Sequence, residues 1–212
     1  MKQLMRIAML IAGIALVASG AARADDNLAE GIDYIRLAAP QPTSDASKIE
    51  VVELFWYGCP HCYQLEPMLE KWAGALPDDV ALVRIPAVLN PRWDVLARAY
   101  YTAEMLGVVE QIHAPLFKAI HEKKQKLDDE DALAEFFVAQ GVDEKQFRET
   151  YKSFGVVSKV NRARQMTQRY GIRGVPALVI DGKYRTSASE AGSHADMLKV
   201  TDALIARERQ AR

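Results

Sequence analysis

The stretch KIEVVELFWYG, residues 48–58, constrains the fold of this chain most strongly. It is rich in β-branched and aromatic side chains and is bounded by turn residues, which predicts a buried central strand. Pro60 follows and fits the first turn of a helix, where its missing N–H is not needed. The sequence therefore predicts a strand that passes directly into a helix, which runs to about Leu76 with a kink at Pro67.

The other periodic segments complete a sheet covered by helices. Strands are expected at 32–38 and 80–88 and in a hairpin that turns at Asp181-Gly182, and helices at 156–170 and 193–208. Between about residues 90 and 154 only helical signals occur, and so long a stretch is too ordered to be a loop. We interpret it as a helical insertion. Without it, the order is β-β-α-β-α-β-β-α, a central mixed sheet of the α/β class flanked by helices.

The first 24 residues differ from the rest of the chain. Lys2 and Arg6 form a positive start, Ile7 to Ala18 is an apolar run, and Ala22-Arg23-Ala24 is a cleavage pattern. These parts predict a secretory signal peptide, because a membrane-spanning helix needs about 20 apolar residues and this run is shorter. We therefore expect residues 25–212 to be the mature protein, in a compartment where thiols can be oxidised.

The charge balance gives no argument for nucleic acid as a partner. The whole chain has 27 basic and 28 acidic side chains and a formal net charge of −1, and removal of the signal would leave −4. Nucleic-acid binding usually requires a basic surface, which this balance does not predict. Half of the residues are hydrophobic, enough for a chain of this length to form a core without disulfide support.

Both cysteines lie in one short motif, Cys59-Pro60-His61-Cys62, where the strand passes into the helix. A static disulfide across so small a loop would restrict the unfolded chain very little. A zinc site would need two further ligands at suitable spacing, and the other histidines form no short motif. A C-x-x-C pair within a βαβ pattern is typical of a thioredoxin-like redox motif.

The position of each thiol predicts its role. Cys59 lies just before the helix, where free backbone N–H groups and the positive end of the helix dipole favour an anion. Only a thiolate attacks a disulfide, so Cys59 should be the attacking thiol and the more covered Cys62 its resolving partner. Pro60 fixes the turn, and His61 places an imidazole beside the sulfur of Cys59.

Three segments resemble the DsbA family of bacterial periplasmic thiol-disulfide oxidants, which belongs to the thioredoxin superfamily. They are ELFWYGCPHCY at 53–63, Gly174-Val175-Pro176-Ala177, and the late Asp-Gly-Lys-Tyr hairpin. The resemblance spans nearly the whole mature chain. It implies a thioredoxin fold over residues 25–212 that is interrupted by the helical insertion at about 90–154.

The resemblance also implies a role for a charged residue inside the central strand. Glu53 would be a buried carboxylate beneath the active site, placed to take or give the proton of Cys62, with a pKa raised by desolvation. The alternative is that Glu53 faces solvent at the end of its strand. Glu66 and Arg84 match charged positions near the site in the family, although they could equally be ordinary surface or paired charges.

The Val175–Pro176 bond is expected to be cis and to lie against the cysteine pair, because the matching proline is cis in thioredoxin-like proteins. A proline at the start of a strand is poorly placed for a central ladder. In this position it would expose the backbone of Val175, so that an extended substrate could add as a strand beside the disulfide.

Together these features predict a periplasmic oxidoreductase that donates its Cys59–Cys62 disulfide to newly exported proteins through a mixed disulfide. The resemblance implies two partners: unfolded exported proteins with free thiols, and a membrane quinone-linked reoxidase similar to DsbB. It implies no metal and no organic cofactor, and nothing indicates more than a monomer. The alternatives are a periplasmic disulfide isomerase or reductase, and a peptide-binding holdase whose cysteines are incidental.

Overall fold

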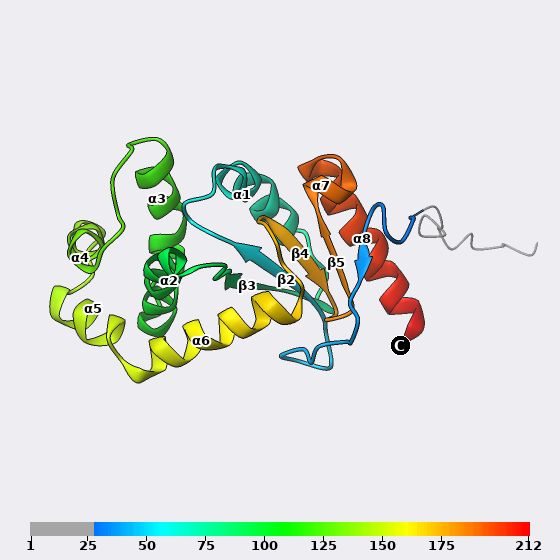
Figure 1. Cartoon of the computed structure of the whole chain (residues 1–212), viewed down its shortest axis with the longest axis horizontal. Coiled ribbons are helices and arrows are strands. Elements are labelled where there is room, and N and C mark those ends of the chain that lie inside the picture. The colour runs from blue at the N-terminus through cyan, green and yellow to red at the C-terminus, as the bar shows by residue number, and fades with distance from the viewer. Residues whose placement is uncertain (1–27) are drawn as a thin grey trace, which may run out of the picture.

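The computed structural model describes residues 28–212, so the predicted signal peptide lies outside the described residues. Five strands form one mixed sheet in the order β1-β5-β4-β2-β3. They are β1 (Ile35–Arg36), β2 (Ile49–Phe55), β3 (Val80–Pro86), β4 (Ala177–Ile180) and β5 (Tyr184–Ser187). Only β2 and β3 are parallel, and the other neighbouring pairs are antiparallel. The expected α/β class with a mixed central sheet is confirmed (Figure 1).

The predicted central strand is β2, which lies between β4 and β3 and has every one of its seven residues buried. It ends at Phe55, three residues earlier than the sequence pattern predicts, because the chain turns at Trp56–Gly58 before α1 (Pro60–Ala73) begins. Helix α1 continues as one helix through Pro67.

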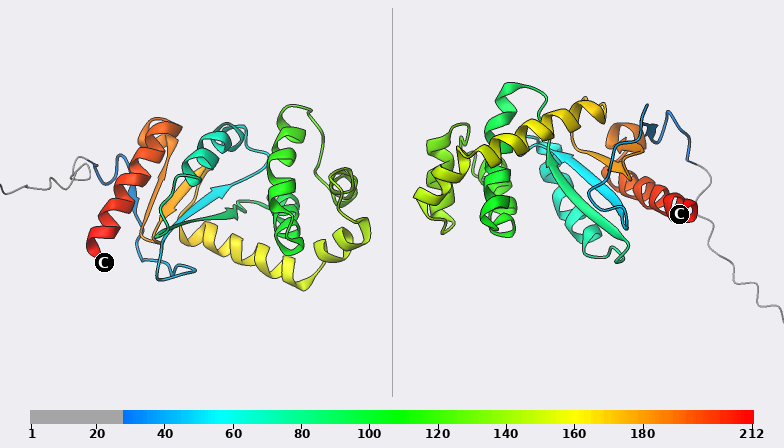
Figure 2. Two further views of the ribbon diagram at one scale, coloured as in Figure 1. Left: turned by 180° about the vertical axis from the view of Figure 1, so that it is seen from behind. Right: turned by 90° about the horizontal axis from the view of Figure 1, so that it is seen from below.

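Two helical layers cover the sheet. Apolar side chains of α1 and α8 (His194–Ala211) pack on one face, against Ile49 and Val51 of β2. Met166 of α6 (Phe154–Arg169) and the adjacent Tyr170 pack on the other face, against Val52 and Leu54. Figure 2 shows α6 and α1 on opposite sides of β2. Because successive side chains of a strand point to opposite faces, Glu53 must share the face of Val51, beneath α1.

The helical insertion stands beside the sheet and is joined to it by the long helix α6 (Figure 1). A short 3₁₀ turn, Pro91–Trp93, leads into α2 (Asp94–Leu106), α3 (Val109–His121), α4 (Glu130–Ala139) and α5 (Glu144–Tyr151). These helices enclose a second apolar core around Phe117, Phe137 and Phe147. Phe55, Tyr57 and Cys62 belong to that same core, so the end of β2 is packed from the side of the insertion.

The hairpin between β4 and β5 explains why Asp181-Gly182 is needed. Both residues have positive φ angles, 49° and 61°, which suit the two central positions of a tight hairpin turn. A Cβ atom at Gly182 would lie 2.0 Å from the carbonyl oxygen of Gln41, so a larger residue does not fit. A short helix, α7 (Ala188–Ala191), follows β5.

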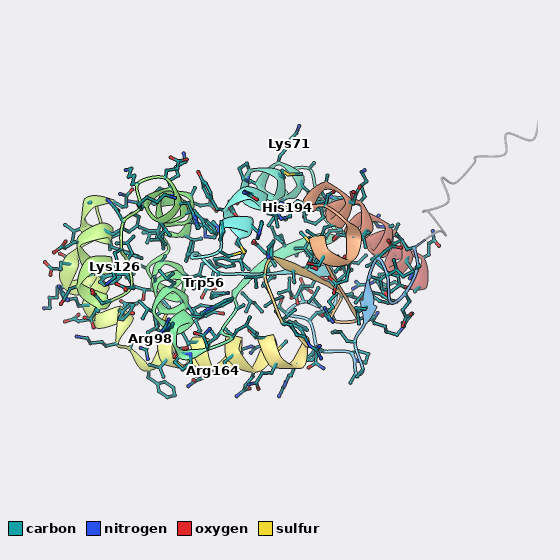
Figure 3. All side chains as sticks on the ribbon, turned by 45° about the horizontal axis from the view of Figure 1, so that its top comes forward. Trp56, Lys71, Arg98, Lys126, Arg164 and His194 are labelled. Atoms are coloured by element: carbon teal, nitrogen blue, oxygen red, sulfur yellow. The ribbon has the colours of Figure 1, made fainter. Side chains whose placement is uncertain are left out.

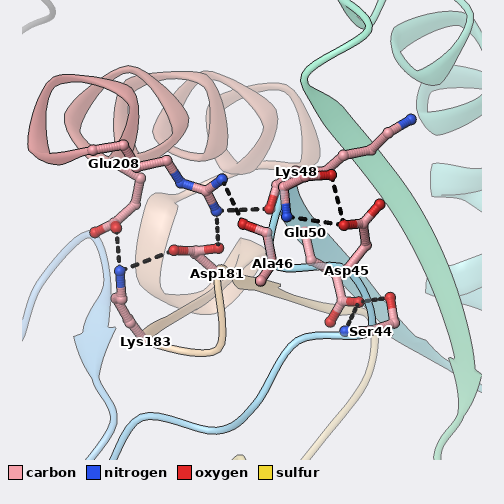
Figure 4. Close-up of polar contacts among 10 residues, drawn as sticks. Ser44, Asp45, Ala46, Lys48, Glu50, Asp181, Lys183 and Glu208 are labelled. Atoms are coloured by element: carbon pink, nitrogen blue, oxygen red, sulfur yellow. Dashed lines mark hydrogen bonds and ion pairs between the residues drawn. The ribbon is translucent and has the colours of Figure 1, made fainter.

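Polar contacts fasten the last turn of α8 to this hairpin (Figure 4). Lys183 Nζ lies 2.9 Å from Asp181 Oδ2 and also pairs with Glu208 of α8. Arg212 reaches Asp181 Oδ1 at 2.9 Å and donates to the carbonyl oxygen of Lys48 at 2.6 Å. These contacts tie the C-terminal end of α8 to the β4–β5 hairpin and to the start of β2. Within residues 28–212, no helix is both long and apolar enough to cross a membrane.

We predict that Leu65→Ala lowers the free energy of unfolding by about 2–5 kcal/mol, because Leu65 of α1 is fully buried in the core between α1, α8 and the sheet. Met68→Ala is the matched control on the same helix. Met68 is 39% exposed, and its truncation should change the free energy of unfolding by about 0.5 kcal/mol or less. Urea unfolding of both variants gives the comparison, and equal losses would contradict the assignment of this core.

Candidate active site

The two cysteines occupy the turn between β2 and the first turn of α1. Cys59 is the N-cap residue of α1, with φ −89° and ψ 117°, and its backbone N–H donates to the carbonyl oxygen of Trp56 at 2.9 Å. No side chain caps this end of the helix, and Pro60 occupies the first helical position. The first backbone N–H groups of α1 are therefore directed at the sulfur of Cys59.

The environments of the two thiols differ. Cys59 is half-buried, whereas Cys62 has no exposed surface, and both are free thiols in this structure. The hydrogen bond from Cys62 lowers the pKa of Cys59 to about 6, assisted by the backbone N–H groups of Cys62 and His61 and by the charge of His61, while burial opposes the change. Burial raises the pKa of Cys62 well above its ordinary value. Cys59 can therefore ionise while Cys62 keeps its proton.

The loop before β4 closes the site from the opposite side. The Val175–Pro176 peptide bond is cis, as the resemblance implied. In the thiol form, Cys59 Sγ donates to the carbonyl oxygen of Val175 at 3.3 Å. Pro176 is buried, and Val175 is partly exposed. The structure thus brings Val175 and Pro176 to the cysteine pair.

His61 lies at the exposed rim of the site. Its Nδ1 is 3.3 Å from Gln64 Oε1, and the centre of its ring is 6.3 Å from that of His194 at the start of α8 (Figure 3). Partial burial, followed by the charge of His61, lowers the pKa of His194. An open cavity of about 580 Å³ begins here. Its lining includes His61, Arg173, Val175, Pro176, Glu190 and His194.

Glu53 lies in the interior of the protein with no exposed surface, so the alternative that it faces solvent is wrong. Arg84 Nε of β3 donates to its Oε2 at 3.1 Å. Burial, and then the negative charge of Glu66, raises the pKa of Glu53 to about 8 against the opposing effect of Arg84. A carboxyl group in this state keeps a proton at neutral pH.

Glu66 and Arg84 form ion pairs beneath the active site and are not surface charges. Only 7% of the Glu66 side chain and 16% of the Arg84 side chain are exposed, and their charged atoms are 3.6 Å apart. Arg84 also pairs with Glu70, whose side chain is half-exposed. One guanidinium thus faces the three carboxylates Glu53, Glu66 and Glu70.

Sequence reasoning missed the contacts that hold the active-site turn to the insertion. Trp56, which is labelled in Figure 3, stacks on Trp93, and the ring centres are 4.5 Å apart with the planes 6° apart. His121 Nε2 of α3 donates to the carbonyl oxygen of Tyr57 at 2.7 Å, and Tyr57 Oη lies 2.7 Å from Nδ1 of His113. Nothing in their spacing along the chain predicts these pairs.

The histidines do not combine with acidic or thiol groups into a candidate metal centre. Across residues 28–212, no three side chains of the types His, Cys, Asp and Glu come together as metal ligands would.

The comparisons with known proteins agree with this geometry. The family model of the DSBA-like thioredoxin domain matches residues 50–200. The thiol:disulfide interchange protein DsbA of Pseudomonas aeruginosa is 42% identical over 211 residues, covering 100% of this chain and 99% of the relative. DsbA of Azotobacter vinelandii is 40% identical over 205 residues, covering 95% of this chain and 96% of the relative. The crystal structure of Pseudomonas aeruginosa DsbA matches with a TM-score of 0.85 and 41% identity, over 88% of this chain and 97% of that one.

We predict that the thiolate absorbance of the reduced protein appears with a midpoint near pH 6, the pKa of Cys59. Cys62→Ala removes the hydrogen bond that contributes most to stabilising the Cys59 thiolate. This variant should raise the midpoint by about one pH unit or more. His61→Ser removes a weaker, partly screened charge and should raise it by less. An ultraviolet titration measures all three midpoints, and a wild-type midpoint close to the ordinary thiol value of 9.0 would contradict the assignment.

A second prediction concerns the pH dependence of stability. The pKa of Glu53 is raised from 4.5 to about 8, so its contribution to stability is complete below pH 4.5 and is lost as the pH rises through 8. Relative to Glu53→Gln, the wild type should therefore lose about 2–4 kcal/mol between pH 5 and pH 8. Glu149→Gln, at an exposed position, should leave the pH profile unchanged. Urea unfolding at a series of pH values tests this, and parallel profiles for wild type and Glu53→Gln would refute it.

Proposed function

The chain belongs to the DsbA family of thiol:disulfide interchange proteins, and from this membership we propose that it is a disulfide donor to newly exported proteins. It is a thiol-disulfide oxidoreductase with its active site at Cys59 and Cys62. The observation that carries the proposed direction is the difference between the two thiols. The pKa of Cys59 is lowered to about 6 and that of Cys62 is raised, so the reduced pair rests with a stable thiolate at Cys59.

The reaction begins with the oxidised pair. A substrate thiolate attacks Cys59 Sγ, the bond between Cys59 and Cys62 breaks, and a mixed disulfide forms between the substrate and Cys59. Cys62 leaves with the electron pair and takes up a proton. A second substrate thiolate then attacks the substrate sulfur of the mixed disulfide and releases Cys59 as a thiolate. Two electrons pass from the substrate dithiol to the protein, and the substrate leaves with a disulfide.

Glu53 is the proposed source of the proton for Cys62. The carboxyl group has a pKa of about 8 and lies on the face of β2 that α1 covers, and α1 carries Cys62. Cys62 needs the proton when it leaves, because burial makes its thiolate unstable. Glu53 would return to its protonated state when the pair is reoxidised. Pro60 would act by fixing the start of α1, and His61 by its charge beside Cys59.

Substrate is proposed to bind as an extended segment against Val175 and Pro176. The carbonyl oxygen of Val175 lies against Cys59 Sγ and accepts its hydrogen bond only while Cys59 is protonated. In the disulfide form that oxygen is free to accept a backbone N–H of a substrate. The open cavity next to it provides space for the side chains that flank a substrate cysteine.

The acidity of Cys59 supplies part of an oxidising potential. At pH 7 a thiol pKa of about 6 stabilises the reduced form by about 1.4 kcal/mol relative to an ordinary thiol, equivalent to about 30 mV. Solvent screening lowers this contribution, since Cys59 is only half-buried. The remaining driving force must come from destabilisation of the disulfide form by its surroundings.

The proposal includes a location and a partner. The relatives that match over nearly the whole chain are named thiol:disulfide interchange protein DsbA, and such membership supports action in the periplasm after cleavage of residues 1–24. After donating its disulfide, the protein must be reoxidised. We assign this step to a membrane quinone-linked protein similar to DsbB, which would oxidise Cys59 and Cys62 of the monomer.

We predict that equilibration with glutathione gives a reduction potential well above the value of about −270 mV that thioredoxin has. Above pH 6 only one proton accompanies the two electrons, because Cys59 is a thiolate, so the potential should fall by about 30 mV per pH unit. Below pH 6 both thiols bind protons, and the slope should double to about 59 mV per pH unit. Redox titrations at several pH values measure the slope and its break.

Cys59→Ser is the control variant for the donor assignment, and it is tested by oxidation of a dithiol peptide. This variant should lose all oxidation of a dithiol peptide, whereas a holdase with incidental cysteines would keep its full activity of preventing aggregation. A potential equal to that of thioredoxin would remove the donor assignment in favour of a reductase.

A further inference from the structure

His113 is a buried histidine to which the proposed reaction gives no role. It lies on α3 of the insertion and is 5% exposed. Its Nε2 is 3.1 Å from Glu66 Oε1, and its Nδ1 is 2.7 Å from Tyr57 Oη. The rings of Phe55, Tyr100 and Phe117 also pack around it, with centres 5.2–6.1 Å from the imidazole centre. The imidazole is therefore held in one orientation.

The two partners of the imidazole decide where it carries a proton. Nε2 lies within ion-pair distance of Glu66 Oε1, but the contact does not have hydrogen-bond geometry in this structure. An ionised carboxylate can only accept, so hydrogen on Nε2 is the arrangement that favours the charged form of Glu66. The hydroxyl of Tyr57 can either donate or accept, so it satisfies Nδ1 in both the neutral and the charged ring. Hydrogen on Nε2 would thus face Glu66 in both the neutral and the charged ring.

Glu66 connects His113 to the carboxyl group beneath Cys62. Arg84 lies 3.6 Å from Glu66 and 3.1 Å from Glu53, and it also pairs with Glu70 at the protein surface. When His113 is neutral, one guanidinium cannot neutralise three carboxylates, and two of these carboxylates are buried. A proton must therefore be retained within the cluster, because uncompensated buried charge is strongly unfavourable. Hydrogen on His113 Nε2 favours the ionised form of Glu66, so the retained proton is favoured on another carboxyl group of the cluster.

We propose that His113 is a positioning residue for the dithiol reaction: by holding the hydrogen of its Nε2 against Glu66 it keeps Glu66 ionised, so that the retained proton resides on Glu53 beneath Cys62. This inference rests on the proposed role of Glu53 as the proton source. It places one determinant of the reaction on the helical insertion, outside the sheet and α1.

The surroundings of His113 support this assignment. The titratable and charged groups that face it directly or through one neighbour come from five elements: Tyr57 of the turn, Glu66 and Glu70 of α1, Glu53 of β2, Arg84 of β3 and Tyr100 of α2. Burial acts to raise the pKa of Glu66, but His113 and then Arg84 outweigh it and lower the pKa overall. Burial and then the charge of Glu66 raise the pKa of Glu53.

The test is a carbon NMR titration of the glutamate carboxyl groups in the reduced full-length mature protein, with the Glu53 signal assigned by its loss in Glu53→Gln. His113→Phe keeps an aromatic ring but removes the donor. Glu66 should then become protonated, and the midpoint of Glu53 should fall from about pH 8 by about one unit. Glu66→Gln should produce a fall of similar size.

Two matched variants separate this effect from packing. Tyr57→Phe removes the other partner of His113 and should leave the Glu53 midpoint within the error of the wild type. His113→Gln restores an N–H donor and should recover most of the midpoint. The inference is overturned if His113→Phe leaves the midpoint near 8 while Glu66→Gln lowers it, or if Tyr57→Phe lowers it as much as His113→Phe.

A second measurement does not depend on the folding of any variant. Nitrogen NMR of the wild-type imidazole reports which ring nitrogen of His113 carries hydrogen. A neutral ring with hydrogen on Nδ1 and a bare Nε2 would overturn the inference, and hydrogen on Nε2 supports it. Failure of the proposed function is distinguishable. If Glu53→Gln oxidised a dithiol peptide at the wild-type rate at every pH, Glu53 would not be the proton source, whatever the titration of Glu53 showed.

Discussion

The active site depends on one constraint: a fully buried strand ends close to the N-terminus of a helix. Because β2 is enclosed by neighbours on both edges and by helices on both faces, its last residue cannot shift, and Cys59 is delivered to the N-terminus of α1. The unpaired N–H groups there stabilise negative charge on sulfur. The same strand carries Glu53 toward α1, so a single element positions both the reactive sulfur and the carboxyl group beneath it.

Burial then produces opposite effects on groups that lie only a turn apart. The half-buried Cys59 accepts hydrogen bonds and loses its proton readily. Cys62, inside the protein, keeps its proton. Glu53 also keeps its proton in the interior, although Arg84 is within hydrogen-bonding distance. The site therefore combines an exposed anion with two protonated groups behind it. In the proposed reaction, this arrangement would separate the sulfur that meets the substrate from the groups that give and take the proton.

Local sequence patterns were sufficient for much of the fold. The hydrophobic run of β2, the proline at position 60 and the Asp181-Gly182 turn each specify local structure by their own chemistry, and the structure follows them. The cysteine pair, whose members are close in sequence, was also predictable as the redox site. Contacts between elements were not, because the meeting of Tyr57 with His113 depends on how α3 packs against β2. The partners of Arg84 stayed open at the level of the sequence for the same reason, although the residue itself was singled out.

The contacts of α3 with Tyr57 have a consequence for the Cys59–Cys62 motif. His121 holds the carbonyl oxygen of Tyr57, while His113 meets its hydroxyl, so both ends of a residue two positions before Cys59 are fixed by the insertion. If Cys59-Pro60-His61-Cys62 were transferred to a scaffold that lacks these helices, the motif sequence would be present. The contacts that support its turn would be missing. The motif and the contacts that support its turn therefore come from different parts of the chain, and the site needs both.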